Sequence, residues 1–175
     1  MARPSISQIR ASSDHAVMFR WNLVISKFPL GLTGPPTTEE LNIRAESTEQ
    51  PTRVGQTIVN NIRGHQVKQG GIWTYNPITL VFAETTDNLV NKFIHDWIEL
   101  SWETKTGVSV TKANLEADIV MQRLNNLDEP IVEFKCVGCI PEAEDKGGNL
   151  DGATSDVIRP SLTLNYDFFE RTSLI

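Results

Sequence analysis

The stretch VMFRWNLVIS, residues 17–26, decides the fold class. Apolar residues recur in it at every second position from Val17 to Ile25, with Trp21 and Leu23 at the centre. Because successive side chains of a strand point to opposite faces, a period of two predicts a β-strand with one apolar face. This is the clearest strand signal in the chain, and it predicts a β-rich domain.

The same alternation marks further extended segments. Residues 57–69 and 73–84 predict a long hairpin with its turn at Gly70 and Gly71, because glycine adopts the positive φ angles of tight turns. Several segments exceed the usual strand of about five or six residues, which is typical of a barrel or a shared sheet wall. The remaining extended segments are predicted at residues 39–47, 115–124, 131–140 and 157–169.

The period changes to a helical one after Asp87, with Thr86 as the expected N-cap. A helix of about 24 Å could cover one open side of the sheet, anchored by Phe93 and Trp97. The predicted fold is therefore mainly β: a single domain over residues 1–175, an antiparallel β-sandwich or barrel with one flanking α-helix and a polar N-terminal arm at residues 1–16. The apolar positions at helical spacing are Leu89, Val90, Phe93, Ile94, Trp97 and Ile98.

The bulk composition narrows the function classes. The 175 residues are 39% hydrophobic and 22% charged, which is typical of a globular domain. A net charge of −6 argues against a nucleic-acid-binding surface, because such surfaces need clustered Lys and Arg. No apolar run approaches the roughly 20 residues of a membrane span, and residues 1–16 have no apolar core of a signal peptide. We expect no membrane association.

A search for chemistry predicts no enzyme, no cofactor and no metal. Cys136 and Cys139 form a Cys-x-x-Cys pair without a second pair, and His15, His65 and His95 are scattered. On a regular strand, residues three apart face opposite sides with their Cα atoms about 10 Å apart, too far for a disulfide. Ordinary buried or half-buried thiols are the favoured interpretation, with an intersubunit disulfide as the alternative. No catalytic or phosphate-binding motif is present.

A set of landmarks along the chain resembles the tail tube proteins of contractile-tailed bacteriophages and the tube subunits of related injection systems. The opening strand resembles that family at residues 19–25, and the helix does so at residues 93–97. Each match is weak by itself, and the preserved order gives the resemblance its specificity. The other matching segments are residues 62–64, 77–80, 130–132, 140–141, 162–164 and 168–171.

The resemblance implies a structural subunit that forms six-membered rings, which stack into a hollow tube through which DNA passes during ejection. The implied partners are further copies of the chain and the tail sheath, baseplate and tail terminator proteins, with DNA in transit but not specifically bound. The implied location is the virion tail, assembled in the host cytoplasm. A tube subunit of a secretion-type or phage-derived injection particle that delivers protein is the main alternative. A ligand-binding β-barrel is a second one.

If the chain lines a bore, polar residues two apart on one strand face should line it. An outer solvent face is the equally weighted alternative for each residue. Two sets opposite apolar residues are candidates: Glu40, Asn42, Arg44 and Glu46, and Asp118 with Gln122.

Overall fold

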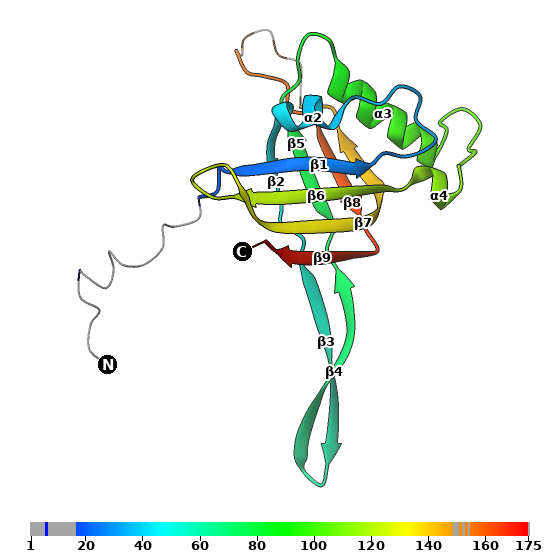
Figure 1. Ribbon diagram of the computed structural model, residues 1–175. Helices are drawn as coiled ribbons and strands as arrows, with labels where there is room; N and C mark the ends of the chain where they lie inside the picture. Colours follow the sequence, from blue (N-terminus) through cyan, green and yellow to red (C-terminus); the bar gives the residue numbers. More distant parts are fainter. Residues whose placement is uncertain (1–5, 7–16, 149–150, 152, 154, 175) are drawn as a thin grey trace.

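The computed structural model describes residues 6, 17–148, 151, 153 and 155–174. These residues form a body of two sheet layers with helices at one end, and a hairpin that projects from the body (Figure 1). The strands are β1 (Trp21–Lys27), β2 (Ala45–Thr48), β3 (Arg53–Ile62), β4 (His65–Tyr75), β5 (Ile78–Phe82), β6 (Ala117–Leu124), β7 (Pro130–Asp145), β8 (Ser161–Asn165) and β9 (Phe168–Ser173). The helices are α2 (Thr38–Arg44), α3 (Leu89–Ser101) and α4 (Lys112–Leu115).

The body is an antiparallel sandwich whose two layers share strand β7. Residues 130–137 of β7 pair with β6 and β9, and Cys139 makes one further pair with Ala117 of β6, whereas residues 140–145 pair with β8. Between the two halves lies Gly138, whose positive φ of 68° bends the strand from one layer into the other. The first layer is β1-β6-β7-β9 and the second is β7-β8-β5-β2. Within the described residues the sheet does not close into a barrel, because β1 and β2 end the path of paired strands.

The core lies between the two layers and follows the predicted alternation. Buried and half-buried residues alternate through β5 and β8, and through β6 as far as Gln122. The opening strand starts at Trp21, and its Leu23 and Ile25 are buried as the period of two predicts. The mainly β fold with a flanking helix is therefore confirmed.

Helix α3 covers one end of the sandwich (Figure 1). Phe93 and Trp97 lie in the core, 4% and 0% exposed, and their rings are 5.6 Å apart. The indole Nε1 of Trp97 donates a hydrogen bond of 2.8 Å to the Leu115 carbonyl oxygen, so this buried polar atom has a partner. The N-cap is Asn88 rather than the predicted Thr86, and it adopts the left-handed conformation.

The segment at residues 39–47 was predicted as extended, and this prediction is wrong for residues 39–44, whereas residues 45–47 lie in strand β2 as predicted. Residues 38–44 form helix α2, which begins with a capping box between Thr37 and Glu40. The Glu40 amide donates to Thr37 Oγ1, and the Thr37 amide donates to the Glu40 carboxylate. Such reciprocal bonds satisfy two backbone donors that a helix start leaves free. Leu41 then buries its side chain in the core, which fixes the helix in place.

The predicted hairpin turn at Gly70 and Gly71 is also wrong. The turn lies at Arg63 and Gly64, whose φ angles are 50° and 83°. Two consecutive positive φ angles characterise the two-residue turn that matches the twist of antiparallel strands. The two glycines lie inside β4 instead.

Cys136 and Cys139 were predicted to face opposite sides of a regular strand, and this prediction is wrong because β7 bends between them. Cys136 pairs with Ile119 and Cys139 with Ala117, two residues apart on β6, so both thiols point into the core and both are fully buried. Gly138 shifts the alternation by one residue between them. The segment predicted as one strand at residues 157–169 is likewise broken, and it yields β8 and the start of β9.

Candidate subunit interface

The most unusual surface is the hairpin of β3 and β4, residues 53–75, which we call the projecting hairpin. It extends away from the body, and no other helix or strand of the described residues lies beside its outer part (Figure 1). Every residue of β3 is exposed, as are nine of the eleven in β4. Ten residues of strand span about 33 Å at roughly 3.3 Å per residue, so the hairpin reaches far from the core.

The base of the projecting hairpin is fixed to the body by an aromatic cluster. The Tyr75 ring lies 5.8 Å from that of Tyr166 and 5.7 Å from that of Phe169. The Tyr166 hydroxyl donates to the Thr52 carbonyl oxygen at 3.3 Å, and the Asn76 amide donates to the same oxygen at 3.1 Å. Burial raises the pKa of Tyr166 from its ordinary value of 10.0 to about 12, so the phenol keeps its proton and this bond at pH values where an exposed tyrosine would ionise.

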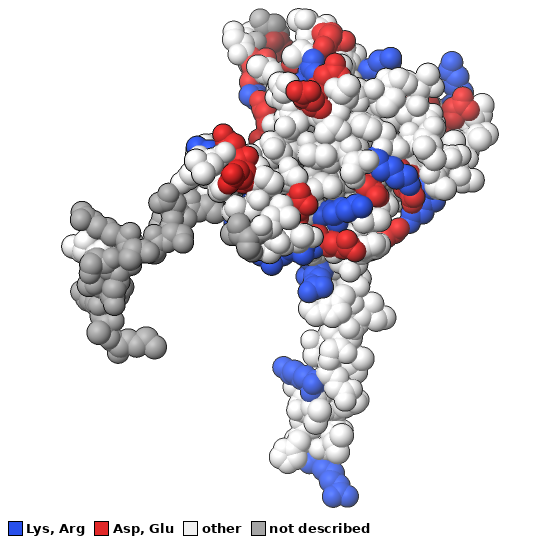
Figure 2. Space-filling model, in the orientation of Figure 1, with Lys and Arg blue, Asp and Glu red and all other residues white. Residues whose placement is uncertain are grey.

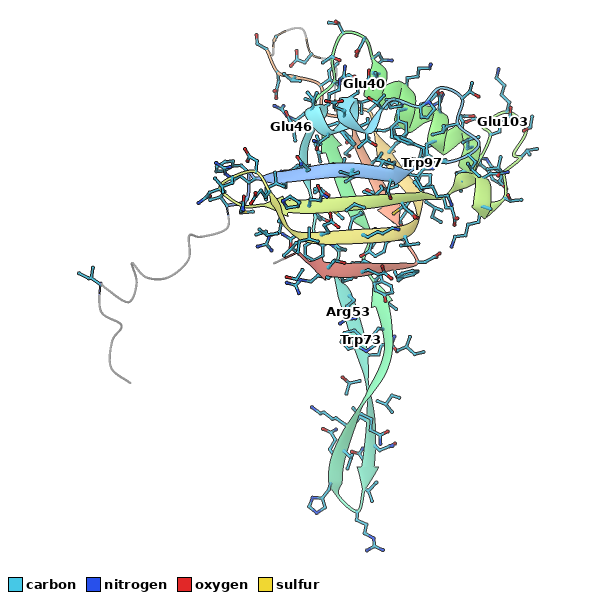
Figure 3. The ribbon with its side chains drawn as sticks, viewed as in Figure 1. Glu40, Glu46, Arg53, Trp73, Trp97 and Glu103 are labelled. Atoms are coloured by element: carbon cyan, nitrogen blue, oxygen red, sulfur yellow. The ribbon has the colours of Figure 1, made fainter. Side chains whose placement is uncertain are left out.

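Near the base of the hairpin, Arg53 and Trp73 form a second contact. The guanidinium carbon lies 5.2 Å from the centre of the indole ring, within cation–π range (Figure 3). Gly55 leaves room for this ring, because a Cβ there would lie 3.0 Å from the indole. Even so, Trp73 remains 58% exposed.

The strand register slips where the base meets the outer part. Gly55 pairs with Trp73, but Thr57 pairs with Gly70, so one residue of β3 opposes two of β4. This is a β-bulge, which locally breaks the ladder and increases the twist. A Cβ on Gly71 would lie 3.0 Å from the Gln56 carbonyl oxygen, whereas one on Gly70 would meet no atom within 4 Å.

The projecting hairpin differs in charge from the rest of the chain. It contains Arg53, Arg63 and Lys68 and no Asp or Glu. The remaining residues therefore hold 13 Lys and Arg against 22 Asp and Glu, a formal charge of −9 beside +3. Figure 2 shows only basic charge along the hairpin and mixed, often acidic charge on the body.

The projecting hairpin also exposes apolar side chains. Monomeric proteins rarely expose large continuous apolar patches, and such patches mark contact surfaces. In the described part of the chain, no element outside the hairpin covers its outer residues. The exposed apolar residues of the hairpin are Val54, Ile58, Val59, Ile62, Val67, Ile72 and Trp73.

The two outer strands of the first layer differ in how their free edges are protected. Asn42 of α2 accepts the Leu23 amide at 2.7 Å, and Thr38 donates to the Ile25 carbonyl at 2.8 Å. Side chains of α2 thus form hydrogen bonds with backbone groups at the outer edge of β1, so these groups are not available to another strand. At the opposite edge, the Leu174 amide donates to the Ile131 carbonyl oxygen, so by antiparallel alternation the backbone groups of Phe169 and Arg171 in β9 point away from β7. An exposed edge of this kind is a template for pairing with another chain.

The residues predicted to line a bore do not share one face. Glu40 belongs to the capping box, Asn42 faces β1, and Arg44 binds Asp87 at 2.8 Å. Glu40, Asn42 and Arg44 were grouped because alternate residues of a strand share a face. They lie on a helix instead, where residues two apart point in different directions. Glu46, on β2, forms an ion pair of 2.7 Å with Arg159.

Asp118 and Gln122 do share a face, on the outer side of β6. Lys135 approaches Asp118 at 3.6 Å, and Gln122 donates to Glu133. Both residues are half-buried by these neighbours on the sheet, and they form the only predicted pair that the structure keeps together on one strand face.

An open groove of about 520 Å³ lies where the first layer begins. Its lining mixes apolar side chains, including Met18, Phe19 and Trp21, with polar and charged ones, including Arg20 and Glu46. In the part of the chain that the structure describes, no group of three or more His, Cys, Asp or Glu is placed to hold a metal. Burial raises the pKa of Cys136 to about 12 and also raises that of Cys139, so neither thiol is activated as a nucleophile. Among the described helices, none has the length and apolar character of a membrane span.

Comparison with solved structures identifies the fold. An extracellular contractile injection system's PVC sheath/tube terminator matches with a TM-score of 0.70 and 15% identity, over 93% of this chain and 100% of the other. The anti-feeding prophage cap, a tube-terminating cap, matches with a TM-score of 0.68 and 16% identity, over 93% and 94%. The PVC sheath-tube complex in its extended state matches with a TM-score of 0.65 and 18% identity, over 98% and 100%.

The chain has the fold of these injection-system components. The predicted resemblance to tail tube proteins is therefore confirmed at the level of the fold. No protein-family model matches the sequence, and no curated protein matches it by sequence. The likeness thus lies in the arrangement of strands and helices, and the sequence identity is only 15–18%.

Proposed function

We propose that this protein is a non-enzymatic structural subunit of the tube of a contractile particle, in which copies of the chain form six-membered rings that stack. The proposed partners are further copies of the chain and the particle's sheath, baseplate and terminator components. The proposed location is the assembled particle, either a phage tail built in the host cytoplasm or an injection particle.

The projecting hairpin is the observation that carries this proposal. A two-stranded hairpin is marginally stable by itself in water, and the outer part of this one has no core beneath it. Exposed aliphatic side chains there are unfavourable in a monomer, because water surrounds them, but they can be buried against a neighbouring subunit in an assembly. The fold likeness to chains of a sheath-tube complex, a tube-terminating cap and a sheath/tube terminator supports the same role.

The cargo differs between the two forms of the proposal. A phage tube passes DNA, whereas an injection particle of the alternative kind delivers protein. The net charge of −6 per chain supports passage of DNA without adhesion, since acidic residues outnumber the Lys and Arg that would hold phosphates, 22 to 16. The same negative charge would also keep acidic cargo proteins from adhering to the tube, so it does not distinguish the two cargoes.

Asp118 and Gln122 are the best-supported bore-lining candidates, because they lie together on an outer sheet face that no described element covers. Glu40, Asn42 and Arg44 remain candidates only as part of helix α2, and Glu46 only as part of β2. If Asp118→Lys and Gln122→Lys subunits form tubes that hold DNA fragments while wild-type tubes do not, these residues line the bore. Equal retention would exclude them.

Electron microscopy of the purified protein tests the main proposal. We expect rings or tubes at high protein concentration. A variant in which residues 57–70 are replaced by a short Gly-Ser turn should remain folded, because these residues make no contact with the body, but it should not form tubes. A wild-type protein that stays monomeric at every concentration, with and without preformed particles as seeds, would contradict the proposal.

A further inference from the structure

The outer part of the projecting hairpin, residues 57–70, has two chemically different faces. Residues directly opposite each other on antiparallel strands point to the same side. The register therefore assigns every side chain beyond the bulge to one of two faces. Face one holds Ile58, Asn60, Ile62, His65, Val67 and Gln69; face two holds Thr57, Val59, Asn61, Gln66, Lys68 and Gly70.

Face one carries a continuous apolar strip. Val67 lies opposite Asn60, which places it diagonally between Ile58 and Ile62. Diagonal neighbours of this kind are about 7–8 Å apart, within reach of branched side chains. The three aliphatic side chains are 51%, 58% and 43% exposed for Ile58, Ile62 and Val67. Among the residues that the structure describes, none outside the hairpin packs against them.

Face two is hydrophilic by comparison. Its only aliphatic side chain is Val59, which lies opposite Lys68. Threonine, asparagine and glutamine supply the rest of its surface, so water satisfies this face without a partner. The two faces therefore differ in what they can bury, although they belong to the same two strands.

We propose that face one docks onto a second copy of this chain through Ile58, Ile62 and Val67, while face two stays in water. This inference rests on the proposed function, because it names the surface that joins the copies. Charge complementarity favours a second copy as the partner of the hairpin as a whole, because the hairpin carries +3 and the rest of the chain −9. The apolar side chains, and not the charge, select face one, because Lys68 lies on face two. Contact between two different surfaces of the same chain is heterologous, and such contacts continue from copy to copy.

Two substitutions one residue apart test the assignment. Ile58→Ser and Val59→Ser each shorten an exposed β-branched residue, 51% and 45% exposed, on opposite faces of β3. Neither should change the melting temperature. We expect Ile58→Ser to raise the concentration at half-assembly about tenfold or more, as the loss of a central apolar contact does, and Val59→Ser to raise it less than about twofold. Light scattering and sedimentation measure this concentration.

Protection of an introduced thiol gives a second readout. Ile58→Cys and Val59→Cys can be alkylated selectively, because Cys136 and Cys139 are fully buried. Assembly should protect the thiol at position 58 and leave that at position 59 reactive. Equal effects at the two positions, or stronger effects at position 59, in proteins that still assemble would overturn the face assignment while leaving the tube proposal intact. A wild-type chain that never associates would overturn both.

Discussion

The body and the projecting hairpin are stabilised by different means, although both are antiparallel sheet. The body buries alternate residues of its strands between two layers, with Trp97, Phe82 and Leu23 almost without solvent contact. The hairpin has the same backbone pairing but no buried residue in β3 and none in β4. Backbone ladders alone contribute little net stability, because water forms the same hydrogen bonds in the unfolded chain.

This difference implies that folding and assembly depend on different parts of the sequence. Substitutions in the body should change the free energy of unfolding, whereas those in the outer hairpin should change association and leave unfolding almost unchanged. Such a division is useful to a subunit that must fold before it assembles. It also predicts where each kind of mutation lies.

Trp97→Ala should give the largest effect. It removes a fully buried indole and leaves the Leu115 carbonyl without its donor, so we expect a loss of about 3–5 kcal/mol in the free energy of unfolding. Trp73→Ala is the matched control on the hairpin, where the ring is 58% exposed. It should cost less than about 1 kcal/mol, from the lost contact with Arg53. Urea unfolding monitored by circular dichroism measures both, and equal losses would contradict the division between body and hairpin.

The buried thiols provide the next test. In the folded protein, burial raises the pKa of Cys136 from its ordinary value of 9.0 to about 12. The unfolded chain therefore loses this proton first, and stability should fall as the pH rises from about 9 towards 12. Cys136→Ala with Cys139→Ala should weaken this decline and leave assembly intact. Unfolding free energies at pH 7 and pH 10 measure the decline, and failure of the double variant to assemble despite normal folding would revive an intersubunit disulfide.

Strands that alternate over their full length could be predicted from the sequence. The segments around Leu23 and Ile119 each bury one face against the other layer, so the local pattern and the tertiary environment agree. Helix α3 was predicted for the same reason, since its apolar positions recur at 3.6-residue spacing. Its start was less predictable, because Asn88 adopts a left-handed conformation that no side-chain pattern indicated.

Features set by single backbone positions were missed. Gly138 bends β7 and so brings the two thiols to the same side of the strand. The pattern of apolar residues around Gly138 does not reveal this bend. In the hairpin, two glycines that lie inside a strand were taken for a turn. The adjacent Gly70 and Gly71 gave a stronger turn signal than Arg63 and Gly64, where the turn lies. The absence of acidic residues over residues 53–75 was available from the sequence, and it would have identified the projecting hairpin as a distinct surface.

The capping box of α2 was another available signal. Thr37 and Glu40 have the spacing of this motif, but the apolar residues after them also alternate. Thr37→Ala should destabilise the body by about 1 kcal/mol, because it removes the acceptor of the Glu40 amide. Thermal unfolding measures the loss. Thr57→Ala, on the hairpin, is the control, and it should leave the melting temperature unchanged.

The smallest expected effects concern the bulge, and they compare two adjacent glycines. Alanine at position 70 would meet no atom within 4 Å, whereas alanine at position 71 would place its Cβ 3.0 Å from the Gln56 carbonyl oxygen. Gly70→Ala should therefore stabilise the outer hairpin by about 0.5–1 kcal/mol, since glycine loses more freedom than alanine when a strand forms. Gly71→Ala should weaken it, because β3 must move away from the new methyl group.

Hydrogen exchange of the hairpin amides distinguishes the two variants. Beyond the bulge, exchange should slow in Gly70→Ala and speed up in Gly71→Ala, while the amides of the body exchange at wild-type rates in both. The base should also be unaffected, because Tyr75, Tyr166 and Phe169 hold it to the sandwich independently of the bulge. If exchange in the body changed together with that of the outer hairpin, the two regions would form one cooperative unit, and the separation between folding and assembly would be lost.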